Sequence, residues 1–476
     1  MAAGTFITVL DQSATAIVTP KIAEEFASDI PTAQWLAIGY MLSVSALMMP
    51  AGALSDLIGR KTAWITGLSI FALSSALASI APSFASILTA KIIMGIGASA
   101  VQANGMAMIA SAFDDNQRGK ALGLHMTVVG IGAIGGPIIG GSIDGVLGWR
   151  AIFMFTSLFS LLAIVIALLV LTGNRKRAMG VESISNSFDW VGACLSAVGL
   201  VGLMLSITFA RDFGWLSVEI LGGLTVTVLA GVGFILWEGN FSKPMLPLSM
   251  FQSMDFSAGA LARFLSFVAS SATFFLMPFF LVSSLGISTA QAAVYLLPGS
   301  VCMAVFGPIS GRMADSVGTR RPAVFGMGCA IVGVFIFSMI NLNTNLLLVS
   351  LAAGLSGTGM SVFMAPNTSA MMGSVSRSRY GIVSAFLNLN RNSAHVVGVA
   401  IPTAVVVGVM ATHGYEADLS DPNVIGNLGL RKAYVQGMSR AFQISTVLMI
   451  ISLLLCLIPG GYKMSSDKSK SGRRRS

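Results

Sequence analysis

The stretch Gly130-Ile-Gly-Ala-Ile-Gly-Gly-Pro-Ile-Ile-Gly-Gly141 decides the fold, because it holds six glycines and one proline inside a long apolar run. In water each interior glycine would cost a helix about 1 kcal/mol relative to alanine, and the proline about 3 kcal/mol. In a bilayer no solvent satisfies backbone polar groups, so the helix must form, and a glycine-lined face lets two backbones approach closely. The stretch therefore predicts a membrane protein with a tightly packed helix at this point.

Composition extends this prediction to the whole chain. Of the 476 residues, 55% are hydrophobic and 10% are charged, whereas ordinary soluble domains are about 25% charged. The mean hydropathy is +0.83, and apolar runs near the ~20 residues needed to cross a bilayer recur along the sequence. We therefore predict an all-α polytopic membrane protein and exclude a soluble fold.

Charge and cysteine usage exclude several function classes. The net charge of +9 comes from basic residues in short loops and a C-terminal tail, where such residues set membrane topology, so we expect no nucleic-acid partner. The four cysteines lie in apolar runs without paired spacing, which favours neither disulfides nor a metal site. The sequence has no G-x-x-x-x-G-K-[ST] motif for ATP and no nucleophile–base pair with enzymatic spacing. We expect a non-enzymatic protein that needs no cofactor and uses an ion gradient.

Apolar runs bounded by charge, glycine or proline predict fourteen spans. They begin near residues 2, 33, 62, 84, 120, 149, 189, 215, 256, 289, 321, 344, 379 and 436. If the N-terminus is cytoplasmic, 19 of the 28 lysines and arginines fall in cytoplasmic segments. This bias predicts that both termini are cytoplasmic.

An internal repeat relates the two halves of the chain. The segment Gly52–Lys61, between spans 2 and 3, has the same Gly-x-x-x-Asp-x-x-Gly spacing as Gly311–Arg320, between spans 10 and 11. The signature residues are Gly52, Asp56, Gly59, Arg60 and Lys61 in the first copy, and Gly311, Asp315, Gly318 and Arg320 in the second. A second echo pairs Gly95 and Gly97 of span 4 with Gly357 and Gly359 of span 12. Parallel six-span repeats are a known transporter plan, with the substrate site between the halves.

The repeat divides the chain into four parts. We predict an N-terminal six-helix bundle over 1–172 and a C-terminal six-helix bundle over 256–462. Between them, 173–255 is a linker with two additional spans, and 463–476 is a basic cytoplasmic tail.

Taken together, these motifs resemble the major facilitator superfamily, and specifically its fourteen-span drug:proton antiporters of EmrB/QacA type. The Gly52–Lys61 loop is similar to the superfamily signature between spans 2 and 3, and Leu10-Asp11 with Thr19-Pro20 is similar to the span 1 motif. The residues similar to the antiporter signature of span 5 are Gly132, Gly136, Pro137, Gly140 and Gly141. The resemblance implies two six-helix bundles plus two inserted helices, and proton-coupled efflux by alternating access. One departure is Lys91 in span 4, where the branch usually has arginine.

Asp11 is the only acidic residue well inside any of the first six spans. A carboxylate at that depth costs on the order of 3 kcal/mol unless it is protonated, paired or hydrated. We interpret Asp11 as a proton-coupling group or an anchor for a cationic substrate, with a structural hydrogen bond as the alternative. Lys91 lies at a depth from which it could reach Asp11, forming a pair that a proton or substrate would separate. The alternative is that Lys91 extends to the membrane interface.

Arg263 in span 9, and Arg391 with His395 in span 13, are further basic groups inside spans. Arg391 and His395 are four residues apart and share a helical face with Asn388. A polar stripe in lipid normally faces a cavity or a neighbouring helix. We favour a cavity or interdomain network for these four residues, with a direct substrate ligand as the alternative.

The two glycine motifs lead to mechanical predictions. Asp56 can accept hydrogen bonds from a neighbouring helix N-terminus, so the Gly52–Lys61 loop is predicted to latch the outward-open state on the cytoplasmic side. The stretch Gly130–Gly141 is predicted to be a proline-kinked, glycine-faced helix at the seam between the halves.

These observations predict a secondary active transporter of the cytoplasmic membrane. We expect it to act as a monomer in the lipid bilayer, exchanging protons for lipophilic drugs or toxic compounds, cations among them. One alternative is an exporter of an endogenous metabolite, lipid or peptide. The other is a non-transporting membrane sensor on the same scaffold.

Overall fold

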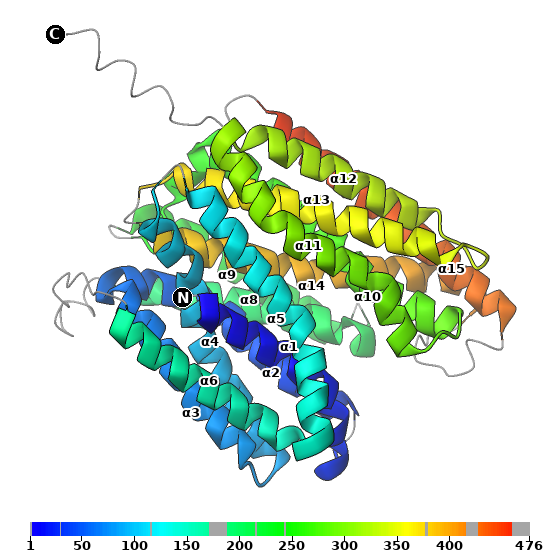
Figure 1. The fold of residues 1–476 in the computed structure, drawn as a ribbon, viewed down its shortest axis with the longest axis horizontal. Coiled ribbons are helices and arrows are strands. Elements are labelled where there is room, and N and C mark those ends of the chain that lie inside the picture. The colour runs from blue at the N-terminus through cyan, green and yellow to red at the C-terminus, as the bar shows by residue number, and fades with distance from the viewer. Residues whose placement is uncertain are drawn as a thin grey trace. The chain divides into compact units, whose positions relative to one another are not determined.

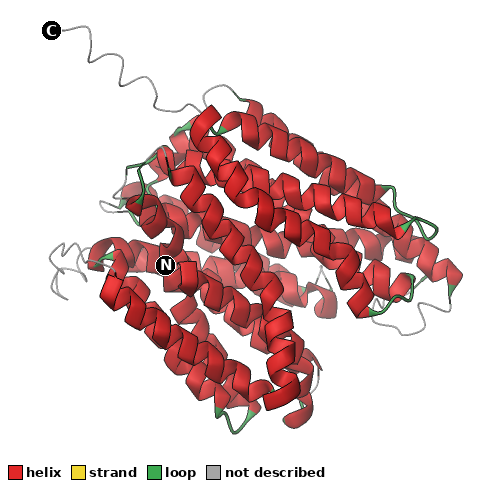
Figure 2. Ribbon diagram, viewed as in Figure 1, coloured by secondary structure: helices red, strands yellow, loops and turns green. Residues whose placement is uncertain are grey.

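The computed structural model describes residues 2–28, 30–114, 117–170, 188–214, 217–241, 244–376, 379–415 and 427–458. Within these ranges the chain forms fourteen long α-helices and no strand (Figure 2). The helices of the N-terminal part are α1 (Ala2–Glu25), α2 (Ile30–Ile58), α3 (Arg60–Ser79), α4 (Phe84–Ala112), α5 (Arg118–Leu147), α6 (Trp149–Val170), α8 (Trp190–Phe213) and α9 (Val218–Asn240) (Figure 1). The remaining helices are α10 (Met254–Phe279), α11 (Thr289–Val317), α12 (Arg320–Ser338), α13 (Leu346–Gly373), α14 (Tyr380–Thr412) and α15 (Leu428–Leu457). The predicted all-α class is confirmed, while the basic tail 463–476 lies outside the described residues.

Thirteen of these helices are long and apolar enough to cross a membrane. The exception is α1, whose middle carries polar residues, among them Asp11. The multi-pass prediction is confirmed, although the last helix begins at Leu428 rather than near residue 436. The apolar run begins later than the helix because Arg431 and Lys432 stand in the first turns of α15. The helix starts ahead of them because Asn427 caps it by accepting the N–H groups of Gly429 and Leu430.

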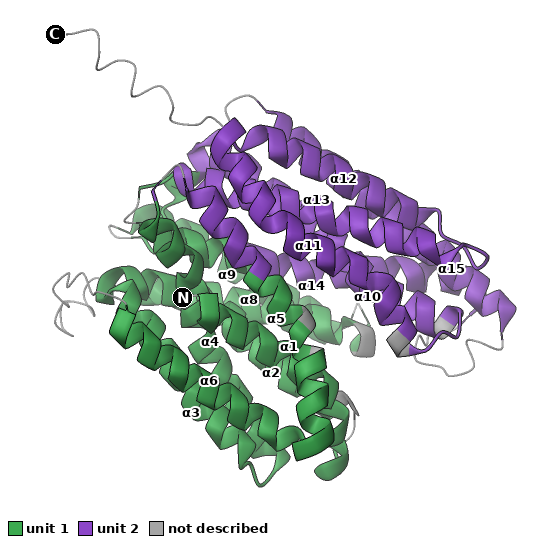
Figure 3. Cartoon of the chain, viewed as in Figure 1, with its two compact units in different colours: residues 1–113, 128–250, 375–389 green, residues 114–127, 251–374, 390–476 purple. Residues whose placement is uncertain are grey.

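The helices gather into two compact units (Figure 3). Unit 1 comprises 1–113, 128–250 and 375–389, and unit 2 comprises 114–127, 251–374 and 390–476. The inserted helices α8 and α9 belong to unit 1, and each unit contains the first turns of a helix that continues in the other. The predicted division at 172 and 256 into folding domains stays a prediction.

Glycines give the two units the same internal packing. In unit 1, α4 packs on α2 at Gly95 and on α3 at Gly97, where an added Cβ would lie 2.7 Å from Ser43 Cβ and 2.6 Å from Phe71 N respectively. In unit 2, α13 packs on α11 at Gly357 and on α12 at Gly359. Backbones this close require glycine. The repeat read from the sequence is therefore a repeat of helix packing.

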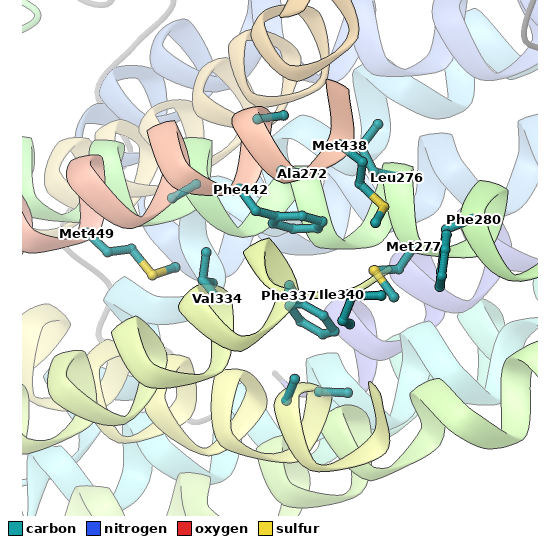
Figure 4. Packing of buried hydrophobic residues seen from close by; sticks show 14 of the residues in the cluster. Ala272, Leu276, Met277, Phe280, Val334, Phe337, Ile340, Met438, Phe442 and Met449 are labelled. Carbon is teal, nitrogen blue, oxygen red and sulfur yellow. The ribbon is translucent and has the colours of Figure 1, made fainter. Parts of the chain in front are cut away.

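Each unit encloses its own apolar core. In unit 2, side chains of α10, α12 and α15 interdigitate (Figure 4). The rings of Phe337 and Phe442 stack there with centroids 5.3 Å apart. In unit 1, the buried cluster includes Trp64, Phe71 and Phe153. The helices that pack together in these cores also carry the polar groups described next.

Candidate functional site

A fully buried ion pair joins α1 to α4 in unit 1. Lys91 Nζ lies 2.7 Å from Asp11 Oδ2, and the two side chains are 1% and 0% exposed. Lys91 also donates to Thr15 Oγ1 at 2.9 Å. Its ammonium lies 5.1 Å from the ring centroid of Tyr40 and 5.2 Å from that of Phe153. The structure thus brings Asp11 and Lys91 together and buries the lysine inside unit 1.

The surroundings of this pair explain its geometry. Gly95, one turn beyond Lys91, allows α4 to press against α2, which carries Tyr40. Thr15 follows Asp11 by four residues, so the two share a face of α1. The second carboxylate oxygen of Asp11, Oδ1, is buried and has no hydrogen-bond partner. A buried pair adds little net stability, because desolvation of the two charges offsets their attraction.

The glycines of α5 divide into two groups. An added Cβ at Gly132 would lie 3.1 Å from Phe6 O, and at Gly136 or Gly140 it would lie 2.7 Å from the Cβ of Ser13 or Ala14. Gly130 and Gly141 have nothing within 4 Å. Positions 132, 136 and 140 therefore form one stripe against α1, while Gly141 lies off it. Pro137 stands within the continuous helix α5, and its side chain is outside the described part of the structure.

The loop aspartate of the first repeat binds the start of α14. Asp56 Oδ2 accepts the N–H of Ile382 at 3.3 Å, and the carboxylate also accepts the N–H of Gly381. Arg60 Nε donates to Asp56 Oδ1 at 3.0 Å. A carboxylate at a helix N-terminus satisfies free N–H groups and the positive end of the helix dipole. Gly52 packs against the start of α14, since an added Cβ at Gly52 would lie 3.1 Å from Gly381 O.

The second repeat makes the same contact in unit 2. Asp315 accepts the N–H groups of Gly119 and Lys120, both at 2.8 Å, at the start of α5. Gly311 approaches the Gly119 backbone. Gly59 and Gly318 have φ of +96° and +87°, a backbone region that favours glycine, and they end the two loops. Arg320 donates to the carbonyl oxygen of Leu457, and Lys61 lies in the first turn of α3.

The sequence predicted that Asp56 accepts hydrogen bonds from a helix N-terminus, but it did not identify Gly119 and Gly381 at the helix starts that the two aspartates bind. Gly119 and Gly381 are 262 residues apart, the same offset as Gly95 and Gly357. An added Cβ would lie 2.6 Å from Asp315 Oδ1 at Gly119 and 2.7 Å from Asp56 Cγ at Gly381. Applying the repeat offset to every glycine would have found both positions.

The four members of the predicted polar network lie in two units. Asn388, in unit 1, donates to the carbonyl oxygen of Gln102 at 3.0 Å. Arg263, Arg391 and His395 belong to unit 2, where His395 Nδ1 lies 2.7 Å from Ser271 Oγ. Arg263 is 1% exposed and donates to Thr368 Oγ1 at 3.0 Å. The structure therefore places His395 of α14 against Ser271 of α10, and Arg263 of α10 against Thr368 of α13. Asn388 contacts α4 instead.

A fold of two repeated helical units, with a buried ion pair and loop aspartates that bind helix starts, defines a polytopic membrane transporter scaffold. The family model of the Major Facilitator Superfamily matches residues 1–399, and the chain belongs to this family. Members of this family are transporters, not enzymes. The predicted family is confirmed.

Similar proteins include several drug-resistance and export proteins. The chain is 29% identical over 412 residues to the tetracenomycin C resistance and export protein of Streptomyces glaucescens, an alignment covering 87% of this chain and 75% of that protein. It is 25% identical over 454 residues to the lincomycin resistance protein LmrB of Listeria monocytogenes, covering 95% and 94%. The crystal structure of the human organic anion transporter MFSD10 matches in fold with a TM-score of 0.64, at 17% identity, covering 94% of this chain and 97% of that one.

Proposed function

We propose that this transporter exports lipophilic drugs or toxic compounds in exchange for protons. The observation that carries the proposal is the fully buried Asp11–Lys91 pair, 2.7 Å long, in unit 1. The resistance and export functions in the names of similar proteins support the direction and the kind of cargo. We place the protein in the cytoplasmic membrane with both termini cytoplasmic, acting as a monomer with the proton gradient as its energy source and no cofactor.

The pair is built to respond to one proton. Protonation of Asp11 removes the negative charge that holds Lys91, and Oδ1 is the oxygen that no hydrogen bond occupies. Lys91 then keeps Thr15 and the faces of two aromatic rings as partners. Because Asp11 is on α1 and Lys91 on α4, separating them loosens one helix from the other. Proton binding is thereby linked to a change in helix packing within unit 1.

In the proposed transport cycle, the loop aspartates Asp56 and Asp315 act as latches. Asp56 and Asp315 each hold the first turn of a helix that continues in the other unit. A carboxylate bound to helix N–H groups can be released and rebound without breaking a core. We assign both contacts to stabilising one conformational state of the transport cycle.

The test is substrate-dependent proton flux in proteoliposomes with an imposed pH gradient. Asp11→Asn keeps the size of the side chain and removes its titration, so dye efflux should lose its dependence on the gradient. The matched control is Asp144→Asn, because Asp144 also pairs with a lysine, Lys21, at 2.5 Å in the same unit, but at helix ends. This variant should keep gradient-driven efflux.

Two results would overturn the proposal. Proton-coupled efflux in Asp11→Asn equal to that of the unmodified protein would remove the ion pair from the coupling. No flux of any dye, drug or metabolite by the unmodified protein would favour a non-transporting sensor on this scaffold.

A further inference from the structure

The interior of unit 2 is positively charged. Among its described helices, two arginines stand far from the helix ends and are buried or half-buried, Arg263 on α10 and Arg391 on α14. The acids of these helices stand at helix ends, since Asp255 is the second residue of α10 and Asp315 is two residues before the end of α11. Asp315 is also occupied by the N–H groups of α5. Within the described part of unit 2, no carboxylate therefore lies at the depth of the two arginines.

Arg263 is only partly satisfied by the protein. One guanidinium nitrogen, Nη1, donates to Thr368 Oγ1 at 3.0 Å and contacts Met364 Sδ at 3.5 Å. The guanidinium lies 5.2 Å from the ring centroid of Phe267. Nε is buried and has no hydrogen-bond partner, and no ion pair of Arg263 is found among the described residues. A guanidinium stays charged when buried, and a buried charge without a counter-ion is strongly unfavourable.

Other cationic or titratable groups converge on the same region. Arg391 is close enough to interact electrostatically with Arg263, His395 and His125. The contact between α10 and α14 is held on one side by Asn390, which donates to Ala260 O at 3.1 Å. On the other side it is held by His395 and Ser271. Arg263 lies between these two contacts along α10, and its guanidinium reaches Thr368 of α13.

We propose that Arg263, with Arg391 and His395, forms the anion-binding part of the substrate site, and that the exported compounds are amphiphilic anions. This inference rests on the proposed export function and names the substrate class. A carboxylate, sulfonate or phenolate would accept the free N–H of Arg263 and neutralise the repulsion among the basic groups. The apolar part of the substrate would contact Phe267 and the neighbouring methionine.

The same charges argue against a lipophilic cation. A cation would need a carboxylate, and Asp11, in the middle of α1, is already neutralised by Lys91 at 2.7 Å. The other buried acids of unit 1, Asp189 and Glu238, stand at helix ends, at the start of α8 and in the last turn of α9. Bringing a cation to Arg263 would add a like charge in a poorly screened environment, which is unfavourable. This assignment departs from the cationic option in the sequence prediction, because the sequence left open whether Lys91 pairs with Asp11 or extends to the membrane interface.

The test compares two dyes that share a xanthene ring and differ in charge. Fluorescein is anionic and rhodamine 123 is cationic. Their binding to the purified full-length protein is measured by fluorescence anisotropy in phosphatidylcholine nanodiscs, and their efflux is measured in proteoliposomes. We expect fluorescein to bind and to be exported in preference to rhodamine 123.

Substitutions then locate the anion site. Arg263→Gln should weaken fluorescein binding by about tenfold or more, because losing a charged hydrogen bond corresponds to one to two orders of magnitude in Kd. Arg263→Lys should recover part of the affinity. Arg440→Gln is the matched control, since Arg440 lies mid-helix on α15 of the same unit but is exposed. Melting temperature and size-exclusion profile identify any variant that fails to fold, and Arg391→Gln then replaces it.

The outcomes separate this inference from the proposed function. Arg263-dependent binding of fluorescein without export of either dye supports the anion site and contradicts the export function. Export of rhodamine 123 that is unaffected by Arg263→Gln, with no fluorescein binding, supports export and overturns the anion site. Displacement of fluorescein by phosphatidylglycerol added to the nanodiscs assigns the site to a lipid headgroup and overturns the substrate assignment.

Discussion

Replacing Gly136 with alanine introduces a single methyl group at the contact between α5 and α1. The new Cβ would lie 2.7 Å from Ser13 Cβ and 2.8 Å from Leu10 O. Carbon atoms in ordinary contact are about 3.5–4.0 Å apart, so α5 must move away from α1 by about 1 Å. Neither obstacle is the flexible end of a side chain, and overpacking of this kind costs about 1–3 kcal/mol.

The displacement should reach the ion pair. Leu10 and Ser13 flank Asp11 on α1, so moving this turn changes the distance from Asp11 to Lys91. We expect Gly136→Ala to lower the melting temperature of the purified protein by several degrees and to slow dye efflux. Gly136→Leu should still insert into the membrane and should abolish exchange.

Gly141→Ala is the matched control, five residues further along the same helix. Its added Cβ meets nothing within 4 Å, so melting temperature and efflux should be unchanged. If the two alanine variants melt and transport alike, the glycine stripe does not determine the packing of α5 on α1, and the reasoning is refuted.

Two further predictions concern buried and latch charges. Lys91→Met should lower the free energy of unfolding by about 3–5 kcal/mol, because Asp11 is left buried and uncompensated. In chemical unfolding, the double variant with Asp11→Asn should recover most of this loss. Additive losses from the two substitutions would contradict the pairing. Asp56→Asn should slow transport without altering the order of preference among substrates, measured as initial efflux rates for a panel of dyes, whereas a changed order would place Asp56 in the substrate site.

The sequence predicted the number and type of helices because bilayer thickness sets the length of each apolar run. It failed in detail where polar residues belong to a helix. The middle of α1 is polar, and α15 begins ahead of its apolar run at Leu428. In both places capping or tertiary packing sustains the helix, and hydropathy carries no information about either.

The candidate site could be predicted in part. The depth of Asp11 and Lys91 suggested a pair, and the spacing of four residues from Asp11 to Thr15 could have added the threonine. Tyr40 and Phe153 could not be found, because they reach Lys91 only through the packing of α2 and α6 on α4 and α3. Likewise the six glycines of the α5 stretch looked equivalent in the sequence. Only the spacing of four residues between Gly132, Gly136 and Gly140 identifies those that pack against α1.

The repeat shows what each unit has kept and what it has changed. Gly398 stands 262 residues after Gly136, and its added Cβ would lie 2.7 Å from Ser271 Cβ, just as that of Gly136 would lie 2.7 Å from Ser13 Cβ. The close helix contact is therefore common to both units.

The charges beside that contact are not common. In unit 1 the contact adjoins an acid already paired with a lysine. In unit 2 it adjoins His395, and α10 also carries the buried Arg263, with no carboxylate among the described residues at their depth. A duplicated contact flanked by a neutralised acid in one unit and by basic groups in the other fits the proposed division of labour, in which one unit binds the proton and the other binds an anion. If each unit instead did both, Arg263→Gln and Asp11→Asn would impair proton dependence and substrate affinity alike.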